Sequence, residues 1–468
     1  MLNLLLRCSG LYLLMVIFGG CSSIKLIYKN RYIYHPYDFE KCMPGENCIL
    51  VKGTYTLDRG IQLLDKANIQ FEGSGSTLIM NSKSPVRNGY CIFNLRDCKN
   101  LSFSNFALDA NRQGRGCAES YAHSFIMAGC QFINLSNTTI ENSVADGIFL
   151  AAGTERDSST FCKHILISNV NITNSCRNGI SIINAYDVTV SGCNILNSNG
   201  LSPEAGIDVE ADTEDPFPSN RNITIESCYF SQNRGCGIMT SQKGSPENIQ
   251  ITNNKVDKCK IGIFVASKLT DVINNEVDDC ELIGIQSIRY DHYPADQNQI
   301  ALNTVAHTEI GIHYCGEGGL IKSNKINECY KTGIWLNGNT VNNTSVDLDK
   351  NTISDVNDFG IYAINFGSID VKRNRISNAQ KEGISITNGI SVVDSNFIQF
   401  SKLGASITGS RCQFTANEIV DCETGISIIG GGKYKPDGIL KYNKFLRVNK
   451  PWFGDFHLLG REGNTESK

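Results

Sequence analysis

Short segments of alternating apolar and polar residues recur along almost the whole chain, and one segment in each period opens with Gly-Ile-x-aliphatic or a close variant. Successive motifs are 21 to 32 residues apart, and the spacings of 21 to 23 are the shortest that recur. Alternation over so few residues is typical of short β-strands and does not fit helices. The motif begins at Gly147, Gly179, Gly206, Gly237, Gly262, Gly284, Gly311, Gly333, Gly360, Gly383, Gly404 and Gly425.

A second element follows each motif and consists of two alternating strands separated by a turn residue, as in Asn248–Val256 and Ser368–Ile376. Three short strands in about 22 residues predict one coil of a parallel β-helix, with Ile, Val and Leu facing inward. Asn tolerates left-handed backbone geometry at turns, and we expect its amide to hydrogen bond to the next coil. The turn Asn residues are Asn254, Asn275, Asn303, Asn324, Asn351, Asn374, Asn396, Asn417 and Asn443.

The repeat, together with the opening segments Gly53–Leu57 and Asn68–Ser76, resembles the pectate-lyase-like superfamily of right-handed β-helices over about residues 50 to 447. The resemblance implies an all-β, single-stranded right-handed parallel β-helix over residues 51–447. Residues 22–50 are expected to form an N-terminal cap or linker, and residues 448–468 a C-terminal cap or tail. The superfamily contains lyases, hydrolases, epimerases and non-catalytic proteins, so the fold alone does not give the activity.

Residues 1–21 have the features of an export signal, because Arg7 precedes an apolar run from Leu11 to Phe18 that is too short to span a membrane. Gly19-Gly20-Cys21 resembles the end of a bacterial lipobox, although Phe18 stands where an aliphatic residue is usual. This resemblance implies lipidation of Cys21 after cleavage. A plain signal peptide is the alternative. We therefore expect a bacterial lipoprotein, periplasmic or on the cell surface, that meets the membrane only through its lipid.

Composition narrows the classes of partner. The net charge is −4, the isoelectric point is near 6.0, and no basic stripe is present, which disfavours nucleic acid as a partner. Nineteen cysteines in an exported chain would suggest a disulfide framework. Cys42 and Cys48 lie outside the repeat and are the best disulfide candidates. The cysteines five residues after a turn Asn are predicted to be buried free thiols, although adjacent coils would also allow a bridge; they are Cys259, Cys280, Cys329 and Cys422.

Strand alternation predicts which residues face outward. If the Ile after each motif Gly points into the core, the next residue points to solvent. Long loops flank the N-terminal and middle coils, so we expect a substrate groove on this strand face. The outward column is Phe149, Ser181, Asp208, Met239, Phe264, Gln286, His313, Trp335, Tyr362 and Ser385.

Three acids on this face are the candidate catalytic residues. Asp208 and Glu210 alternate outward on one strand, and Asp146 enters its own strand two coils earlier. Two coils span about 9.6 Å, near the carboxylate separation of inverting glycosidases. Crowding is expected to raise one pKa and to create a proton donor. The alternative is that these acids are ordinary solvated surface residues.

Candidate substrate-binding residues accompany the acids. Two of them lie on coils next to Asp146, three form an exposed aromatic platform of the kind that binds sugar rings, and two belong to a polar loop. These residues are His123 and Asn178; His313, Trp335 and Tyr362; and Arg289 and Tyr290.

The sequence thus predicts a monomeric, polysaccharide-acting hydrolase or lyase. A non-catalytic glycan-binding or adhesive surface protein is the alternative. The chain lacks the Asn-Thr-Asp, Asp-Asp and Gly-His-Gly contexts of polygalacturonases, and Gly206–Glu210 matches only part of the strand motif of mannuronan C-5-epimerases. Lyases of this fold often use Ca²⁺ with Lys or Arg as base. Clustered acids also suit Ca²⁺, so the cofactor stays open and Ca²⁺ is expected only for a lyase.

Overall fold

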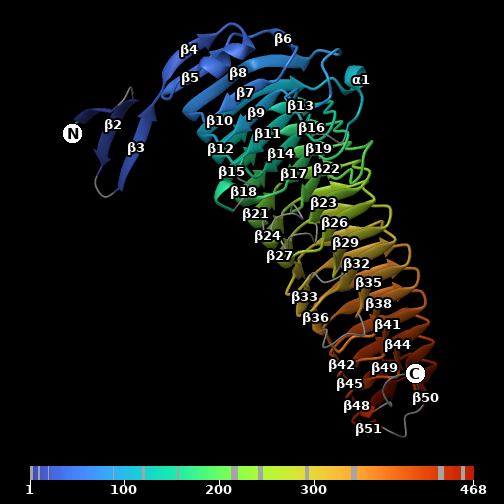
Figure 1. The fold of residues 1–468 in the computed structure, drawn as a ribbon. Helices are drawn as coiled ribbons and strands as arrows, with labels where there is room; N and C mark the ends of the chain where they lie inside the picture. The colour runs from blue at the N-terminus through green and yellow to red at the C-terminus, as the bar shows by residue number, and fades with distance from the viewer. Residues whose placement is uncertain are drawn as a thin grey trace. The chain divides into compact units, whose positions relative to one another are not determined.

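The computed structural model describes residues 4–8, 11–18, 21–87, 89–118, 122–154, 158–211, 220–240, 246–289, 295–338, 345–430, 437–454 and 459–467. The chain divides into two compact units. Unit 1 comprises Met1–Tyr229 and Asn233–Gly235, and unit 2 comprises Phe230–Gln232 and Cys236–Lys468. Apart from three antiparallel strands at the start of unit 1, both units are built from short parallel strands (Figure 1).

Unit 1 begins with three antiparallel strands, β1 (Leu4–Cys8), β2 (Leu11–Phe18) and β3 (Cys21–Ile27). The side chain of Cys21 lies outside the described part of the structure, so its lipidation and the export signal stay predictions. No helix among the described residues is long and apolar enough to cross a membrane.

The first parallel pair of unit 1 is β4 (Lys29–Ile33) with β5 (Glu46–Leu50), and the 3₁₀ helix η1 (Pro36–Lys41) lies between them in sequence. Phe39 of η1 is fully buried, and its ring lies 5.4 Å from Phe71 and 5.9 Å from Phe106 between centroids. The predicted disulfide between Cys42 and Cys48 is present. Its position ties the end of η1 to β5.

The remaining strands of unit 1 pair in parallel, mostly with the strand three places later in the chain. They are β6 (Thr54–Leu57), β7 (Ile61–Leu64), β8 (Ala67–Met80), β9 (Phe93–Arg96), β10 (Lys99–Asp109), β11 (Phe125–Ala128), β12 (Gln131–Ser136), β13 (Thr139–Glu141), β14 (Ile148–Ala151), β15 (Cys162–Ser168), β16 (Asn171–Thr173), β17 (Ile180–Ile182), β18 (Ala185–Ser191), β19 (Asn194–Leu196), β20 (Ile207–Val209) and β21 (Asn220–Glu226), with helices α1 (Arg112–Arg115) and η2 (Ser158–Thr160). Strand β22 (Tyr229–Ser231) has residues in both units.

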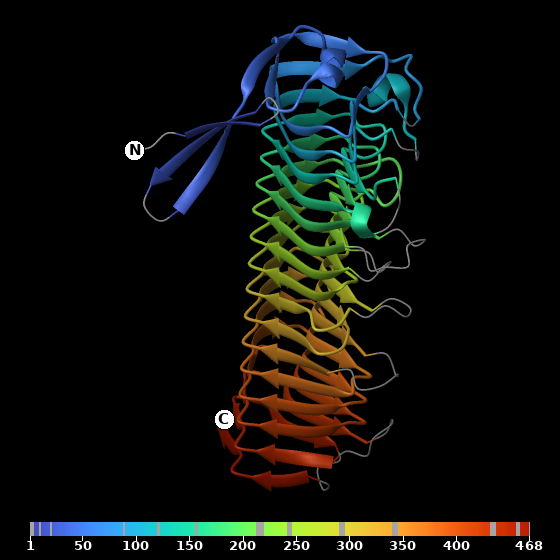
Figure 2. The ribbon, with the colours of Figure 1, turned by 60° about the vertical axis from the view of Figure 1, so that its left-hand side comes forward.

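Unit 2 follows the same rule, and Figure 2 shows its strands stacked coil upon coil. They are β23 (Cys236–Thr240), β24 (Glu247–Thr252), β25 (Lys255–Asp257), β26 (Ile261–Val265), β27 (Lys268–Ile273), β28 (Glu276–Asp278), β29 (Ile283–Ile288), β30 (Gln299–Ala301), β31 (Thr304–Ala306), β32 (Ile310–Cys315), β33 (Gly319–Lys322), β34 (Lys325–Cys329), β35 (Thr332–Asn337), β36 (Ser345–Asp349), β37 (Thr352–Val356), β38 (Phe359–Ile364), β39 (Ser368–Lys372), β40 (Arg375–Ala379), β41 (Glu382–Thr387), β42 (Ile390–Asp394), β43 (Phe397–Gln399), β44 (Leu403–Thr408), β45 (Arg411–Thr415), β46 (Glu418–Val420), β47 (Thr424–Ile429), β48 (Asp437–Lys441), β49 (Lys444–Leu446), β50 (Lys450–Gly454), β51 (Leu459–Glu462) and β52 (Thr465–Ser467). Three strands per coil are therefore confirmed.

The Gly-Ile motif marks a tight corner. A Cβ added at Gly262 would lie 2.4 Å from Val277 Cγ1 and 2.5 Å from the carbonyl oxygen of Gly284, so a larger residue does not fit there. The following Ile263 is fully buried, as are the corresponding Ile residues of neighbouring coils. The predicted inward column of isoleucines is confirmed.

The predicted asparagine ladder runs through unit 2 from Asn254 to Asn464. Nδ2 of each Asn donates to Oδ1 of the next at 2.9 to 3.1 Å. The prediction of left-handed geometry at these Asn was wrong by one residue, because the positive φ belongs to the preceding position, for example Leu302 (60°) and Tyr442 (59°). The ladder Asn instead points inward, where its amide satisfies buried backbone groups.

The repeat cysteines are free and buried, as expected for Cys259, Cys280, Cys329 and Cys422. One disulfide was not predicted: Cys117 is bonded to Cys176, 59 residues later. Only the stacking of coils brings those two residues together.

Candidate functional site

Two columns of unit 1 meet at the predicted catalytic acids. The first column contains His123, Asp146 and Asn178. These residues are aligned because the residues two positions after them, Phe125, Ile148 and Ile180, pair in register across β11, β14 and β17. Backbone hydrogen bonds fix this alignment, because Ser124 N donates to Asp146 O and Gly147 N donates to Asn178 O, both at 3.0 Å. The second column contains Phe149, Ser181 and Asp208, which pair across β14, β17 and β20.

Asp146 is fully buried and surrounded by donors. Its Oδ2 accepts a hydrogen bond from Ser181 Oγ at 2.9 Å and lies 3.5 Å from Arg177 Nη1. His123 Nδ1 lies 3.2 Å from the same oxygen, and the backbone N–H of Asn178 donates to Oδ1 at 3.0 Å. Burial acts to raise the pKa of Asp146, but His123 and Arg177 outweigh it, and the net pKa lies below its usual range. Asp146 is therefore ionised at neutral pH.

Asp208 has the opposite state. Burial raises its pKa to about 8, and the negative charges of Glu210 and Asp146 act in the same direction against Arg177 and Asn178. Asn178 Nδ2 donates to Asp208 Oδ2 at 3.3 Å and to Ser181 Oγ at 3.1 Å. Oδ1 of Asp208 is buried without a hydrogen-bond partner in the described part of the structure. Asp208 is therefore a protonated acid with one unengaged oxygen.

The predicted solvent exposure of these acids was wrong. Asp146 and Asp208 both have an exposed fraction of 0%, and Phe149 has 9%. The ring of Phe149 stacks on His123 at 4.1 Å with 4° between the planes, so the two columns pack against each other instead of facing water. Glu210 is half-buried, and 21% of the Arg177 side chain is exposed. The cluster thus meets solvent at these two residues.

The cluster does not fit a calcium ion as it stands. Every oxygen of Asp146 is engaged by protein donors, one of them the cationic Arg177, and Asp208 is neutral. Ca²⁺ prefers several ionised or carbonyl oxygens that can turn toward it. Among the described residues, Cys42, Glu46 and Cys48 form the only close group of metal-ligating types, and its two cysteines are joined as a disulfide.

The other predicted binding residues lie in unit 2 and form a separate set. His313, Trp335 and Tyr362 pair in register across β32, β35 and β38, and the His313 and Trp335 rings stack at 4.3 Å. Gln286 Nε2 lies 3.0 Å from His313 Nδ1, and burial lowers the pKa of His313 to about 4, so this imidazole is neutral. Arg289 pairs with Glu317 at 3.1 Å. Tyr290 lies outside the described residues.

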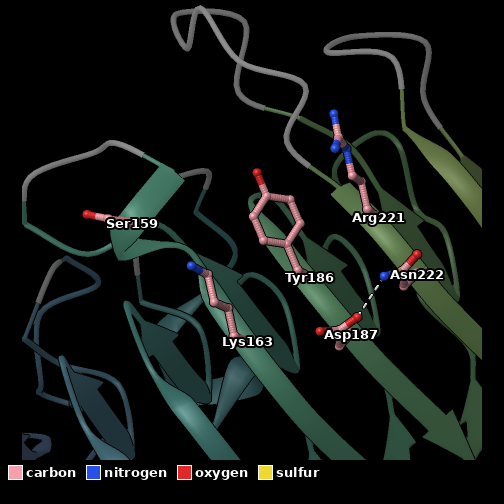
Figure 3. Close-up of a pocket in the computed structure, with 6 residues that line it drawn as sticks. All are labelled: Ser159, Lys163, Tyr186, Asp187, Arg221 and Asn222. Atoms are coloured by element: carbon pink, nitrogen blue, oxygen red, sulfur yellow. Dashed lines mark hydrogen bonds between the residues drawn. The ribbon is translucent and has the colours of Figure 1, made fainter.

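Two features of unit 1 were not predicted as site elements. Arg177 and Ser181 contact Asp146 directly. Their positions in the repeat, next to Asn178 and in the column of Asp208, could have predicted this contact. A cavity of about 460 Å³ also lies between β15, β18 and β21, lined by Ser159, Lys163, Tyr186, Asp187, Arg221 and Asn222 (Figure 3). Sequence alternation alone did not indicate this cavity, because its lining comes from a different sheet.

Comparison with known proteins gives a family match for the repeat region and fold-level similarity to solved structures. The family model described as "Right handed beta helix region" matches residues 123–300 and 217–347. No curated protein sequence matches the chain.

Three solved structures illustrate the similarity. A double mutant of the periplasmic alginate epimerase AlgG is 14% identical, with 86% of this chain and 85% of that chain covered and a TM-score of 0.48. The surface adhesin PfbA of Streptococcus pneumoniae is 16% identical, with 83% of this chain and 85% of that chain covered and a TM-score of 0.38. An exopolygalacturonase from Thermotoga maritima is 13% identical, with 90% of this chain and 84% of that chain covered and a TM-score of 0.29. These likenesses concern the fold and not the activity. Together, the family match and the parallel three-strand coils identify the chain as a right-handed parallel β-helix protein.

Proposed function

We propose that the protein cleaves glycosidic bonds in a polysaccharide, with Asp208 protonating the leaving-group oxygen. The observation that carries the proposal is the state of Asp208: a buried carboxyl with a pKa of about 8 and an Oδ1 that has no partner among the described residues. A carboxylic acid that keeps its proton at neutral pH beside an ionised carboxylate is the arrangement used for general acid catalysis.

The hydrogen bonds of Asp208 place the proton. Asn178 Nδ2 donates to Oδ2, so we assign the proton to Oδ1. A buried polar atom without a partner costs about 1–3 kcal/mol. An oxygen of a bound substrate would accept this proton and remove the penalty.

A second carboxylate is required for glycoside hydrolysis, and Glu210 fits that role. It follows Asp208 by two residues and lies just past the end of β20 (Ile207–Val209), so the prediction that both acids share one strand was wrong. Its negative charge contributes to the raised pKa of Asp208. We assign Glu210 as the general base or nucleophile.

Asp146 is then a positioning residue. Its oxygens hold the backbone of Asn178 and the hydroxyl of Ser181, and Asn178 in turn holds Asp208. Arg177 and Glu210 are the members that reach solvent, so a glycan would approach the acid past these two side chains.

Export remains part of the proposal. The signal-like residues 1–21 support it, and so do the two disulfides of unit 1, because disulfides persist in oxidising compartments. Loss of lipid labelling in a Cys21→Ser variant, with the protein still exported, is the result expected for a lipoprotein anchored by that residue.

The deciding experiment is a screen of the purified protein against neutral and uronic-acid polysaccharides, with and without chelator. New reducing ends without absorbance of an unsaturated product are expected, and chelation is expected to have no effect. Unsaturated product would show a lyase instead. Full activity in the Asp208→Asn variant would contradict the assignment of Asp208 as the general acid.

Non-catalytic glycan binding in unit 2 is a second candidate, favoured by one observation. His313 Nε2 and Trp335 Nε1 are both buried without a hydrogen-bond partner in the described structure, and their rings form a stacked platform. Sugar hydroxyls would satisfy both nitrogens. Since Trp335 is one of only two tryptophans, glycan titration should quench fluorescence in the wild type and much less in Trp335→Phe. Equal quenching in both proteins would exclude this platform.

A further inference from the structure

Three side chains of unit 1 share one register across neighbouring strands. Lys163, Tyr186 and Arg221 are each the second residue of β15, β18 and β21, and they pair in that order. Figure 3 shows all three extending to the same side of the sheet, above the cavity of about 460 Å³ that they line with Ser159, Asp187 and Asn222. With strands about 4.8 Å apart, the two cationic residues are rooted about 10 Å from each other, on either side of the tyrosine.

Among the described residues that line this cavity, Lys163 and Arg221 are cationic and Asp187 is acidic. Asp187 is held at the edge, since Asn222 Nδ2 donates to Oδ1 at 2.8 Å and His164 Nδ1 lies 3.3 Å from Oδ2. Within the described chain, no carboxylate lies within ion-pair distance of Lys163, whose Nζ is 5.7 Å from the centre of the Tyr186 ring.

The ring of Tyr186 contacts a core phenylalanine. Phe161 is fully buried, and its ring lies 5.4 Å from Tyr186 at 55°. Tyr186 itself is half-buried. A ring held in this way, with cations on both sides, offers a flat face for a sugar and charges for an acidic substituent.

The cavity is also close to the strand that carries Asp208. Asn220, next to Arg221, donates from Nδ2 to the carbonyl oxygens of Glu210 at 3.0 Å and of Ile182 at 3.1 Å. These bonds connect the end of β20 to the start of β21 around a corner of the coil. The cavity therefore lies on a different sheet from the acid cluster, and both belong to unit 1.

We propose that the Lys163–Tyr186–Arg221 cleft is a second glycan-binding site, which holds one anionic sugar unit with its carboxylate or sulfate between the two cations and its ring on Tyr186. That the anion belongs to a glycan rests on the proposed function. The site itself rests on the cavity and its charges. It selects acidic chains and orients them, and it takes no part in bond cleavage.

Binding is measured by calorimetry on the full chain carrying Asp208→Asn, so that no probe is cleaved. The probes are hexagalacturonate, cellohexaose and sulfated cellohexaose. Lys163→Gln and Arg221→Gln are each expected to weaken binding of the acidic probe about tenfold, with a smaller effect at high salt because the charges are near the surface. Gln131 occupies the same register position one coil earlier, so glutamine is compatible with this column.

Lys99→Gln is the matched control, since Lys99 is exposed in the same column two coils away and does not line the cavity. It is expected to leave binding unchanged, and Tyr186→Ala is expected to weaken every probe that binds the cleft. If only the sulfated probe depends on Lys163, the anion is a sulfate and the site stands. Acidic-probe binding that is unaffected by Lys163→Gln and Arg221→Gln overturns the proposal. So does the absence of acidic-probe binding to the otherwise folded protein.

The two proposals fail separately. Cleavage that persists in Asp208→Asn would refute the catalytic assignment, and the cleft would then be tested by the difference in acidic-probe affinity that Lys163→Gln or Arg221→Gln causes in a background that does not cleave the probe. Unchanged binding in the Lys163 and Arg221 variants would refute the cleft while leaving the dependence of cleavage on Asp208 intact.

Discussion

The two units differ in the residues that stack from coil to coil at one turn. In unit 2 the residue after the positive φ at the turn between strands such as β33 and β34, or β36 and β37, is a ladder asparagine, such as Asn324 or Asn351. In unit 1 the corresponding residues are Thr138, Val170 and Cys193, which align because the residues after them pair in register. Unit 2 therefore satisfies its buried turn groups by a continuous amide ladder, whereas unit 1 has a hydroxyl, an apolar and a thiol side chain at this turn.

This difference coincides with the distribution of chemistry. Unit 1 contains the ionised Asp146, the protonated Asp208, the cationic cleft and both disulfides. In the described part of unit 2 the cysteines are free and His313 of the aromatic platform is neutral. Regular coils make a uniform scaffold, and irregular coils with cross-links leave room for buried charges that a repeating ladder would not accommodate.

The largest expected effect separates the two units by activity. Glu210→Gln should lower kcat about 1000-fold, because it removes the second carboxylate, and His313→Gln in unit 2 should change kcat less than about twofold while raising KM. Steady-state kinetics on the active glycan test this pair. The same Glu210 variant should shift the pKa of Asp208 below about 8, since the negative charge that helps to raise it is gone. Comparable kcat losses from both variants would contradict the division of roles.

The next effect concerns cross-linking. Replacing Cys117 and Cys176 by Ser opens a bridge that spans 59 residues, and the chain-entropy estimate for such a loop is about 4 kcal/mol. Hydrogen exchange should accelerate in unit 1 and stay unchanged in unit 2. The Cys42–Cys48 pair spans only 6 residues and should give about half that effect. Equal acceleration in both units would show that the bridge does not act locally.

A smaller effect is expected from the ladder. In Asn351→Leu the N–H groups of Asn324 lose their acceptor at 2.9 and 3.0 Å, and Ile321 O loses its donor at 2.9 Å. Buried groups left in this way cost about 1–3 kcal/mol each, so we expect about 3 kcal/mol less stability in urea denaturation. Cys193→Ala, at the equivalent turn of unit 1, should cost about 1 kcal/mol. A Cys193 effect as large as that of Asn351 would remove the contrast between the turns.

The last expected effect is a pH slope confined to unit 1. The folded pKa of Asp208 is raised to about 8 from an ordinary value of 3.8, so the native state binds more protons than the unfolded state between these values. Its contribution to stability is therefore present at low pH and is lost as pH rises from about 4 to about 8, by at most about 1.4 kcal/mol per pH unit. Denaturation of the wild type and Asp208→Asn at several pH values measures the slope, which should flatten in the variant. Parallel curves would mean that Asp208 ionises normally.

Sequence reasoning reached the coil, the core and the alignment of the columns because each depends on a local period. It identified the stacking of His123, Asp146 and Asn178 and the amide ladder from spacing alone. It placed the left-handed turn one residue too late, because the residue type before the ladder Asn varies, as at Leu302, Lys350 and Tyr442, and only the backbone shows that its φ is positive. It missed the Cys117–Cys176 bridge because those residues are 59 positions apart and meet only through stacked coils.

The sequence by itself therefore determined the right-handed β-helix, the inward isoleucines and the residues that share each outward column, because strand period and coil length are short-range properties. The tertiary structure alone decided that Asp146 is ionised and Asp208 protonated, and that Lys163, Tyr186 and Arg221 line one cavity. Burial and through-space charge depend on which atoms pack around a group, and these atoms come from coils of unequal length whose meeting point no single repeat specifies.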